Sequence, residues 1–329
     1  MNRGVVALLC AAMAAALVSP AEATPQNDAL SWLNRLSAAA HRLNYSGTFV
    51  YQNGAISETS RIIHLVDGGN ELERLEVLDG SAREVVRTND EVKCYLPDSQ
   101  LLIVERRSQQ RGFPALLPAG LMELGDYYVV RKGATGRVAG FDSQSIVLEP
   151  RDEFRYGHSF WVHSDSGLLL KAGMVDERGQ VLESFAFTQL QIGGLIDRQS
   201  LKSRYDSADR GAQDWRIDQI QTQEARAEDS SWQFRTPLPG FRRVAEMKRP
   251  ARPGAPESTH VVFSDGLAAI SVFIEPLAGL APAPVNGFST MGAVNIYKRV
   301  SGDYLLVVMG EVPVISLKRL GDGIEAKRR

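Results

Sequence analysis

Short stretches that alternate apolar and polar residues fill most of this chain, and this alternation most constrains its fold. The stretches follow one another at intervals of roughly ten residues, which is the spacing of consecutive strands in all-β domains. Turn signals such as Asn53-Gly54 and Asp79-Gly80 separate them. A period of two predicts β-strands, and tight turns predict that neighbouring strands pair antiparallel. Parallel strands would need a crossover helix, so the pattern predicts an antiparallel meander and excludes a doubly wound nucleotide-binding sheet.

The predicted strands form two groups. The first group comprises residues 46–52, 58–66, 71–78, 83–88, 91–96, 101–105, 127–132, 145–149, 155–162, 168–175 and 180–192. The second comprises residues 232–234, 241–248, 260–264, 270–275, 294–300 and 304–309, followed by a helix that begins at Pro313 and stops at Gly321. Because single cores stop growing at roughly 250–300 residues, a chain of 329 residues is predicted to fold as two domains.

Two helices are predicted in the first group. Leucines at positions 30, 33, 36 and 43 fall on one face of a helix that Asp28 can cap. Residues 113–124 are apolar with few β-branched side chains, and Gly125 offers a stop. The predicted fold class is α+β. It has an N-terminal curved antiparallel half-barrel with both helices on its concave face, and a smaller C-terminal antiparallel sheet domain with a terminal helix.

Apolar residues occur on both faces of the last long strands, which means that both faces are covered at least in part. Phe154, Tyr156, Phe160 and Val162 are predicted to share one side of their strand. Phe185 and Phe187 share a face of the final strand, with Leu182, Ala186 and Leu190 on the other. A curved sheet of this kind can enclose an apolar cavity or a fully packed core, and the sequence leaves both open.

The domain organisation follows from composition. Residues 1–23 read as a secretory signal, with Arg3 before an apolar run too short to span a bilayer and Ala21-Glu22-Ala23 as the cleavage site. An uncleaved anchor is the alternative. The remaining segments are a first domain at 24–196, an exposed, charge-rich linker at 197–230, a second domain at 231–321 and a frayed basic tail at 322–329. The predicted compartment is the periplasm.

No constellation of residues predicts an enzyme. His158 and His163 are five residues apart on a strand and face opposite ways, so they cannot share a metal. The sequence has no nucleophile elbow, no phosphate-binding loop and no dinucleotide fingerprint. Acidic residues such as Asp152 and Glu153 are predicted to lie in solvated loops. We therefore predict no catalytic residue, no metal and no cofactor. After removal of the signal, Cys94 is the one cysteine left in the sequence, and it is either a small core residue or a redox thiol.

Two clusters of basic residues offer sites for an anionic partner. The larger comprises Arg235, Arg242, Arg243, Lys248, Arg249 and Arg252. The smaller comprises Arg106, Arg107 and Arg111. Arginine binds carboxylates and phosphates bidentately, so an acidic protein segment or a lipid headgroup fits, and a merely solvated face is the alternative. The net charge is only -2, and the compartment excludes nucleic acid.

Several segments resemble the RseB/MucB family of envelope-stress regulators. In the first domain they are Asn44-Tyr45-Ser46-Gly47-Thr48-Phe49-Val50-Tyr51, Glu71-Leu72-Glu73-Arg74-Leu75, Ser159-Phe160-Trp161-Val162, Ser166-Gly167-Leu168-Leu169-Leu170-Lys171 and Phe185-Ala186-Phe187-Thr188. In the second domain they are Leu238-Pro239-Gly240-Phe241 and Gly310-Glu311-Val312-Pro313. The resemblance covers nearly the whole mature chain. The first domain is also similar to the LolA/LolB lipoprotein carriers.

The resemblance implies a function. A member of this family is expected to bind the periplasmic domain of a membrane anti-sigma factor and shield it from regulated proteolysis. A lipid signal, lipopolysaccharide or lipoprotein acyl chains, releases it, and the output is an envelope stress response or alginate synthesis. Residues expected to contact the lipid are Leu116, Leu117, Leu121, Phe160, Phe185 and Phe187. The alternative is a lipoprotein or lipid carrier of the LolA type, although such carriers lack a second domain. The sequence leaves the oligomeric state open.

Overall fold

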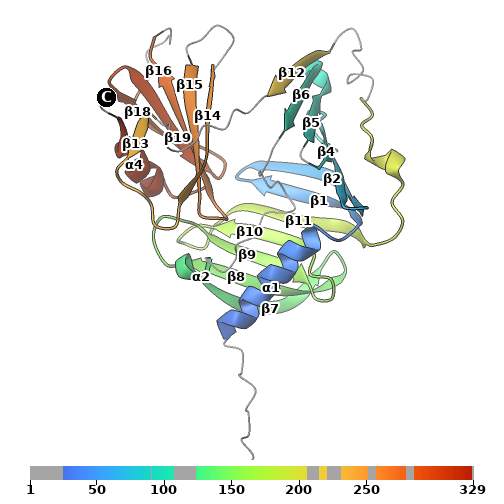
Figure 1. Cartoon of the computed structure of the whole chain (residues 1–329). Helices are drawn as coiled ribbons and strands as arrows, with labels where there is room; N and C mark the ends of the chain where they lie inside the picture. Colours follow the sequence, from blue (N-terminus) through green and yellow to red (C-terminus); the bar gives the residue numbers. More distant parts are fainter. Residues whose placement is uncertain are drawn as a thin grey trace, which may run out of the picture.

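The structure, a computed structural model, describes residues 25–89, 91–106, 124–205, 215–220, 231–250, 257–278 and 285–327. The predicted signal segment lies outside these residues. Two separate sheets dominate the molecule, a large curved one and a smaller one beside it (Figure 1). None of the described helices is long and apolar enough to cross a membrane.

The large sheet has 12 strands, in the order β12-β6-β5-β4-β3-β2-β1-β11-β10-β9-β8-β7. In chain order its first eleven strands are β1 (Tyr45–Asn53), β2 (Ile56–Asp67), β3 (Asn70–Val77), β4 (Glu84–Thr88), β5 (Glu91–Leu96), β6 (Leu101–Arg106), β7 (Tyr128–Val138), β8 (Phe141–Pro150), β9 (Gly157–His163), β10 (Leu169–Val175) and β11 (Val181–Ile192). Each of the eleven was predicted, although β7 runs six residues beyond its predicted end and β8 begins four residues before its predicted start, and all pair antiparallel with one another. Pairing of β1 with β11 joins the two meanders into one sheet.

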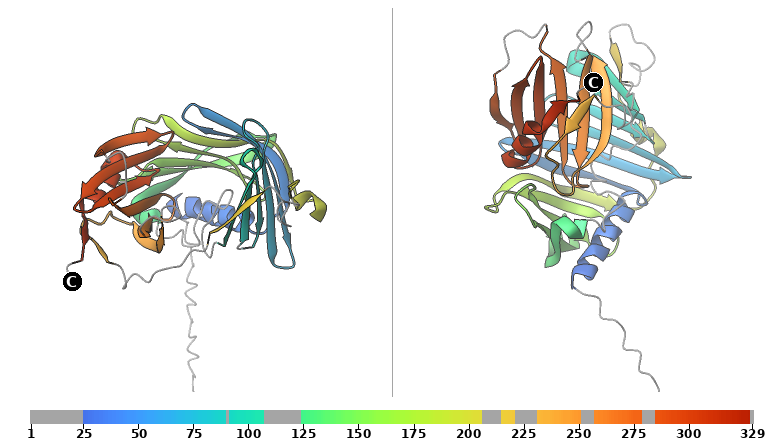
Figure 2. Two further views of the ribbon diagram at one scale, coloured as in Figure 1. Left: turned by 90° about the horizontal axis from the view of Figure 1, so that it is seen from above. Right: turned by 60° about the vertical axis from the view of Figure 1, so that its left-hand side comes forward.

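Helix α1 (Pro25–Ala40) lies under the arch of this sheet, on its concave side (Figure 2). Leu33 and Leu36 of the helix are buried against a cluster that includes Phe49 and Phe160. The helix is held at its ends by an ion pair between Asp28 and Lys132 (3.0 Å) and by Arg35, which donates to the carbonyl of Ser164 (2.7 Å). The curved sheet with a helix on its concave face is thus confirmed.

The second predicted helix lies mostly outside the described residues. Of the predicted residues 113–124 only Leu124 is described, and it begins the short helix α2 (Leu124–Tyr127), which includes Gly125, the predicted stop. The 3-10 helix η1 (Pro97–Ser99) connects β5 to β6.

A β-bulge corrects the predicted faces of β11. The pairs Thr48↔Gln189 and Phe49↔Phe187 leave Thr188 as an extra residue. An extra residue reverses the alternation of every residue beyond it. Leu190 therefore packs against the same core as Phe187, and not on the opposite face as predicted.

The predicted linker at 197–230 is not wholly exposed where the structure describes it. The 3-10 helix η3 (Arg198–Leu201) packs on the face of the sheet opposite α1, and Leu201 is buried there. Arg204 forms ion pairs with Glu76 and Glu84 of that face. Strand β12 (Arg216–Ile220) then joins the edge of the sheet beside β6, in parallel, an orientation that the predicted meander did not include.

The second domain is a six-stranded antiparallel sheet in the order β14-β15-β16-β19-β18-β17. Its strands are β14 (Arg242–Pro250), β15 (Glu257–Ser264), β16 (Ala269–Pro276), β17 (Gly287–Met291), β18 (Val294–Ser301) and β19 (Tyr304–Gly310). The predicted terminal helix is α4 (Val314–Asp322), and it packs on β18 and β19. A two-stranded sheet of β13 (Trp232–Phe234) and β20 (Ile324–Ala326) completes the domain, so this part of the predicted tail is a paired strand and is not frayed.

The two domains meet along a seam that is centred on Arg155, which precedes β9. The Arg155 side chain is fully buried and contacts Asp265 of the second domain (Nη1 to Oδ2, 2.7 Å) as well as Asp152 (Nε to Oδ1, 3.0 Å). It also donates to the carbonyl of Pro239 (2.5 Å). Phe154, predicted to share a side with Phe160, instead joins the core of the second domain. Asp152, predicted to be in a solvated loop, is a partner of this buried guanidinium.

Candidate functional site

The three described residues that were predicted to contact lipid lie in the core under α1. Phe160, Phe185 and Phe187 are each no more than 4% exposed. The rings of Phe185 and Phe187 pack edge to face, with centroids 5.2 Å apart, and each also contacts Phe49. Leu116, Leu117 and Leu121 lie outside the described residues. In this structure the three phenylalanines pack against protein, and their lipid-binding role stays a prediction.

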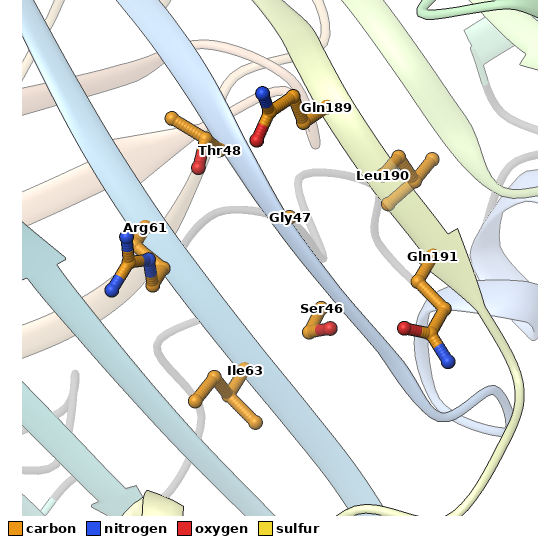
Figure 3. Close-up of a pocket in the computed structure, with 8 residues that line it drawn as sticks. All are labelled: Ser46, Gly47, Thr48, Arg61, Ile63, Gln189, Leu190 and Gln191. Carbon is orange, nitrogen blue, oxygen red and sulfur yellow. The ribbon is translucent and has the colours of Figure 1, made fainter.

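A shallow pocket of about 380 Å³ lies on the other face of the sheet, over β1, β2 and β11 (Figure 3). Most of its side chains alternate along the strands with those buried under α1, so they point away from the helix; Gly47 and Leu190 belong to the inner row and border the pocket from within the sheet. They are mostly polar, and Arg61 is the charged one. The lining residues are Ser46, Gly47, Thr48, Arg61, Ile63, Gln189, Leu190 and Gln191. This pocket is not the apolar hollow that the sequence suggested between sheet and helix.

An apolar row crosses the concave face from the margin of the core under α1, against which its first member, Leu75, packs. Leu75, Val85, Cys94 and Ile103 are cross-strand neighbours on β3, β4, β5 and β6. They continue the line of Ile62, which is buried in the core, but all four are partly exposed. Among the described residues, this row is the part of the concave face that an apolar ligand could contact without displacing the packed core.

A polar row runs beside the apolar one. Tyr45, His64, Glu73 and Arg87 pair in register across β1, β2, β3 and β4 on the same face. His64 is fully buried and stacks on the ring of Tyr45, with centroids 4.9 Å apart. Its Nδ1 lies 2.9 Å from the carbonyl oxygen of Leu43, and its Nε2 lies 3.1 Å from a carboxylate oxygen of Glu71.

Both nitrogens of His64 therefore face acceptors, which requires a proton on each. Burial acts to lower the pKa of His64, but its hydrogen bonds to Glu71 and to the Leu43 carbonyl outweigh burial and raise that pKa. The same hydrogen bond from His64 lowers the pKa of Glu71 to about 2. The row thus contains a buried histidine, with its pKa raised, beside the carboxylate of Glu71.

Two buried polar atoms of the row, the hydroxyl of Tyr45 and Oε2 of Glu73, have no hydrogen-bond partner among the described residues. Burial raises the pKa of Glu73 to about 6, although the charge of Arg87 opposes the shift. Buried polar atoms normally have partners, and exceptions concentrate at functional or hydrated sites. An apolar row flanked by unsatisfied polar atoms is suited to a ligand with an acyl chain and a polar head.

We expect Glu73→Gln to reduce the loss of stability with rising pH. The folded state binds the Glu73 proton more tightly than the unfolded chain does. The protonated Glu73 therefore adds to the free energy of unfolding below pH 4.5, and this contribution is lost as the pH rises through about 6. A shift of that size corresponds to roughly 2 kcal/mol. Urea unfolding of both proteins at pH 4.5 and pH 8 measures it, with the exposed Glu153→Gln as control. An equal pH dependence in wild type and Glu73→Gln would contradict the expectation.

The structure separates the members of the predicted basic cluster. Arg235 pairs with Glu325 (2.9 Å), and Arg243 pairs with the buried Glu246. Arg242 and Lys248 are exposed on β14. The side chain of Arg249 and all of Arg252 lie outside what the structure describes, as do the side chain of Arg106 and all of Arg107 and Arg111. Among the described members of the cluster, Arg235, Arg242 and Lys248 thus have exposed side chains that an anionic partner could reach.

Sequence reasoning missed the polar row. The signal was present, because His64 and Glu73 occupy apolar positions in the alternation of their strands.

Cys94 is partly exposed in the apolar row. Among the described residues, no group of three or more histidine, cysteine, aspartate or glutamate side chains is arranged to hold a metal ion.

Comparison with known proteins gives two family matches along the chain. Residues 28–205 match the MucB/RseB N-terminal domain, and residues 226–325 match the MucB/RseB C-terminal domain. The chain is 32% identical to the sigma factor AlgU regulatory protein MucB of Pseudomonas aeruginosa over 312 residues, which cover 91% of each protein. It is 24% identical to the sigma-E factor regulatory protein RseB of Haemophilus influenzae over 311 residues, covering 92% of this chain and 93% of that protein.

Solved structures agree with these matches. The structure of the Pseudomonas aeruginosa MucA/MucB complex superimposes with a TM-score of 0.73 at 29% identity, over 92% of this chain and 100% of that chain. A crystal structure of MucB in complex with MucA(peri) gives 0.71 at the same identity and coverage. With both domains matched and 32% identity to MucB over 91% of the chain, the chain belongs to the MucB/RseB family.

Proposed function

We propose that this protein is a periplasmic negative regulator of an extracytoplasmic-function sigma factor. It binds the periplasmic domain of a membrane anti-sigma factor, shields that domain from regulated proteolysis and is released by a lipid signal, lipopolysaccharide or a lipoprotein. The regulated output is the envelope stress response and alginate synthesis.

The observation that carries the proposal is the match of 92% of this chain to MucB in its complexes with MucA, with TM-scores of 0.73 and 0.71. The name of the relative from Pseudomonas aeruginosa describes a regulator of a sigma factor. Both domains of the family are present in this chain, and its match covers 100% of the MucB chain in the first of these complexes. The partly exposed apolar row of Leu75, Val85, Cys94 and Ile103 supports the lipid part of the proposal.

In this proposal, binding of the lipid and binding of the anti-sigma factor are coupled. If the two ligands bind different conformations or overlapping surfaces, each lowers the affinity of the protein for the other by the same factor. A protease-protection assay on the periplasmic domain of the anti-sigma factor tests this, with the protein added alone and together with lipopolysaccharide. The expected result is protection by the protein and its loss on addition of the lipid. Lipid binding without any protection would instead favour a lipid carrier of the LolA type.

The basic residues of β14 allow a sharper test of partner binding. Arg243 is unsuitable, because a glutamate there would lie beside the buried carboxylate of Glu246. Arg242→Glu with Lys248→Glu should weaken binding of the anti-sigma domain about tenfold at low salt, with a smaller effect at high salt, because exposed charges are screened. Titration calorimetry at two salt concentrations measures this. The control is Arg178→Glu, whose side chain is 77% exposed on a turn of the first domain. Equal affinity of the double variant and the control would exclude β14 from the interface.

A further inference from the structure

Two carboxyl groups face each other across the seam between the domains. Glu183 lies on β11 of the large sheet, and Glu311 directly follows β19 of the second domain. Their side chains hydrogen-bond to each other, and the hydroxyl of Tyr51 hydrogen-bonds to Glu183. A hydrogen bond between two carboxyl groups needs a proton on one of them, because an ionised carboxylate can only accept. The closed seam therefore favours a proton on one of the two carboxyl groups.

Two hydrogen bonds between the domains flank this pair. On one side the backbone N–H of Ala293, in the second domain, donates to Oδ1 of Asn53 (2.6 Å), and Asn53 is the register partner of Glu183. The amide of Asn53 also donates to the Tyr51 hydroxyl (3.0 Å). On the other side the amide of Asn295 donates to the hydroxyl of Tyr156 (2.9 Å). Repulsion at the pair would thus act directly on the bonds that close the seam.

No cation offsets the two carboxyl groups. Among the described residues, no lysine, arginine or histidine forms an ion pair with Glu183 or Glu311, and Oε2 of Glu183 is buried without a partner. The nearest titratable group on the same row of the sheet is His158, separated from Glu183 by Met174. Burial lowers the pKa of His158 to about 4, so it is neutral in the closed seam above that pH. The buried Arg155 of the seam is already paired with Asp152 and Asp265.

We propose that Glu183 and Glu311 form a proton-controlled latch between the two domains, in which a shared proton keeps the seam closed and its loss drives the domains apart. The proposal rests on the seam alone and not on the regulatory function proposed above.

The direction of the pH dependence follows from the environment of the pair. Burial and the neighbouring charge of Glu311 raise the pKa of Glu183 from 4.5 to about 7. Burial likewise raises the pKa of Glu311. Because the closed state binds the proton more tightly than an open state with solvated carboxyl groups, closure is favoured at low pH. The contribution of the shared proton to closure is lost as the pH rises from about 4.5 through about 7.

Amide hydrogen exchange of Ala293 reports on the latch, because its N–H is bonded across the seam to Asn53. Glu183→Gln and Glu311→Gln each replace an ionisable group by an amide that can donate to the remaining carboxylate at any pH. At pH 8 we expect the Ala293 amide to exchange at least about tenfold more slowly in either variant than in the wild type, tenfold being the ratio for one unit of pKa. At pH 5 the three proteins should exchange alike. Comparison at equal pH removes both the intrinsic pH dependence of exchange and the contribution of His158.

The matched control is Glu177→Gln, a carboxyl group that is 73% exposed at the same end of the sheet. It should behave as the wild type at both pH values. Small-angle scattering of the wild type should also show a larger radius of gyration at pH 8 than at pH 5. The proposal is overturned if Ala293 exchanges equally in wild type and both variants at pH 8, or if the wild type is more open at pH 5. It is also overturned if Glu177→Gln reproduces the effect.

Discussion

Replacing Arg155 with methionine is expected to lower the free energy of unfolding by about 3–5 kcal/mol, the usual cost of removing one partner of a buried ion pair. Methionine retains an apolar side chain of similar length but leaves the fully buried carboxylate of Asp265 without its guanidinium. Arg155 also lies over the rings of Tyr127 and Phe241, at 4.8 and 5.2 Å from their centroids. Calorimetry should therefore show a lower melting temperature and separate transitions for the two domains.

The control for this prediction is Arg131→Met. Arg131 also pairs with a carboxylate, Glu149, but both side chains are about half exposed. Exposed pairs contribute less than about 1 kcal/mol, so this variant should unfold almost as the wild type does. If Arg155→Met cost no more than Arg131→Met, the seam would not depend on the buried pair.

Phe187→Ala is expected to lower the free energy of unfolding by a similar amount, about 3–5 kcal/mol, because it removes a ring from a packed core. Phe187 is 3% exposed and contacts the rings of Phe49 and Tyr45. Gly47 lies directly against it: a Cβ atom at position 47 would be 2.8 Å from the Phe187 ring. Denaturant unfolding followed by fluorescence or circular dichroism measures the loss.

The comparison variant is Phe288→Ala. Phe288 is 49% exposed on the edge strand β17, so its truncation should cost about 1 kcal/mol or less. The Phe187 result also bears on the predicted lipid contact. A loss below about 1 kcal/mol, together with weaker lipid binding, would place Phe187 at the wall of a cavity and contradict its assignment to the packed core.

The strands could be located from sequence because the alternation that reveals them is local. A strand with one buried face needs an apolar residue at every second position, whatever its partner is. Turn residues such as Gly54 and Gly302, which adopt positive φ angles of 59° and 58°, are equally local signals. The segments that escaped prediction, β12, β17 and β20, are short edge or terminal strands with little buried apolar surface.

The candidate site could be predicted only in part. The concave face and its apolar character followed from the pattern of the strands. The placement of Phe187 in a packed core, and the exposure of Leu75 and Ile103 instead, depend on where α1 ends along the sheet. The bulge at Thr188, which moves Leu190 to the inner face, is invisible to a count of alternating residues.

By itself, the sequence determined the division into a large and a smaller sheet, eleven of the twelve strands of the large sheet and the antiparallel pairing of those eleven. Tertiary structure alone decided that His64 lies beside Glu73, that Arg155 reaches Asp265 and that Glu183 meets Glu311. The reason is that alternation and turn chemistry act between residues that are close in the chain. A pairing across 110 residues, like that of Arg155 with Asp265, is set by the register of the strands and the packing of one domain on the other.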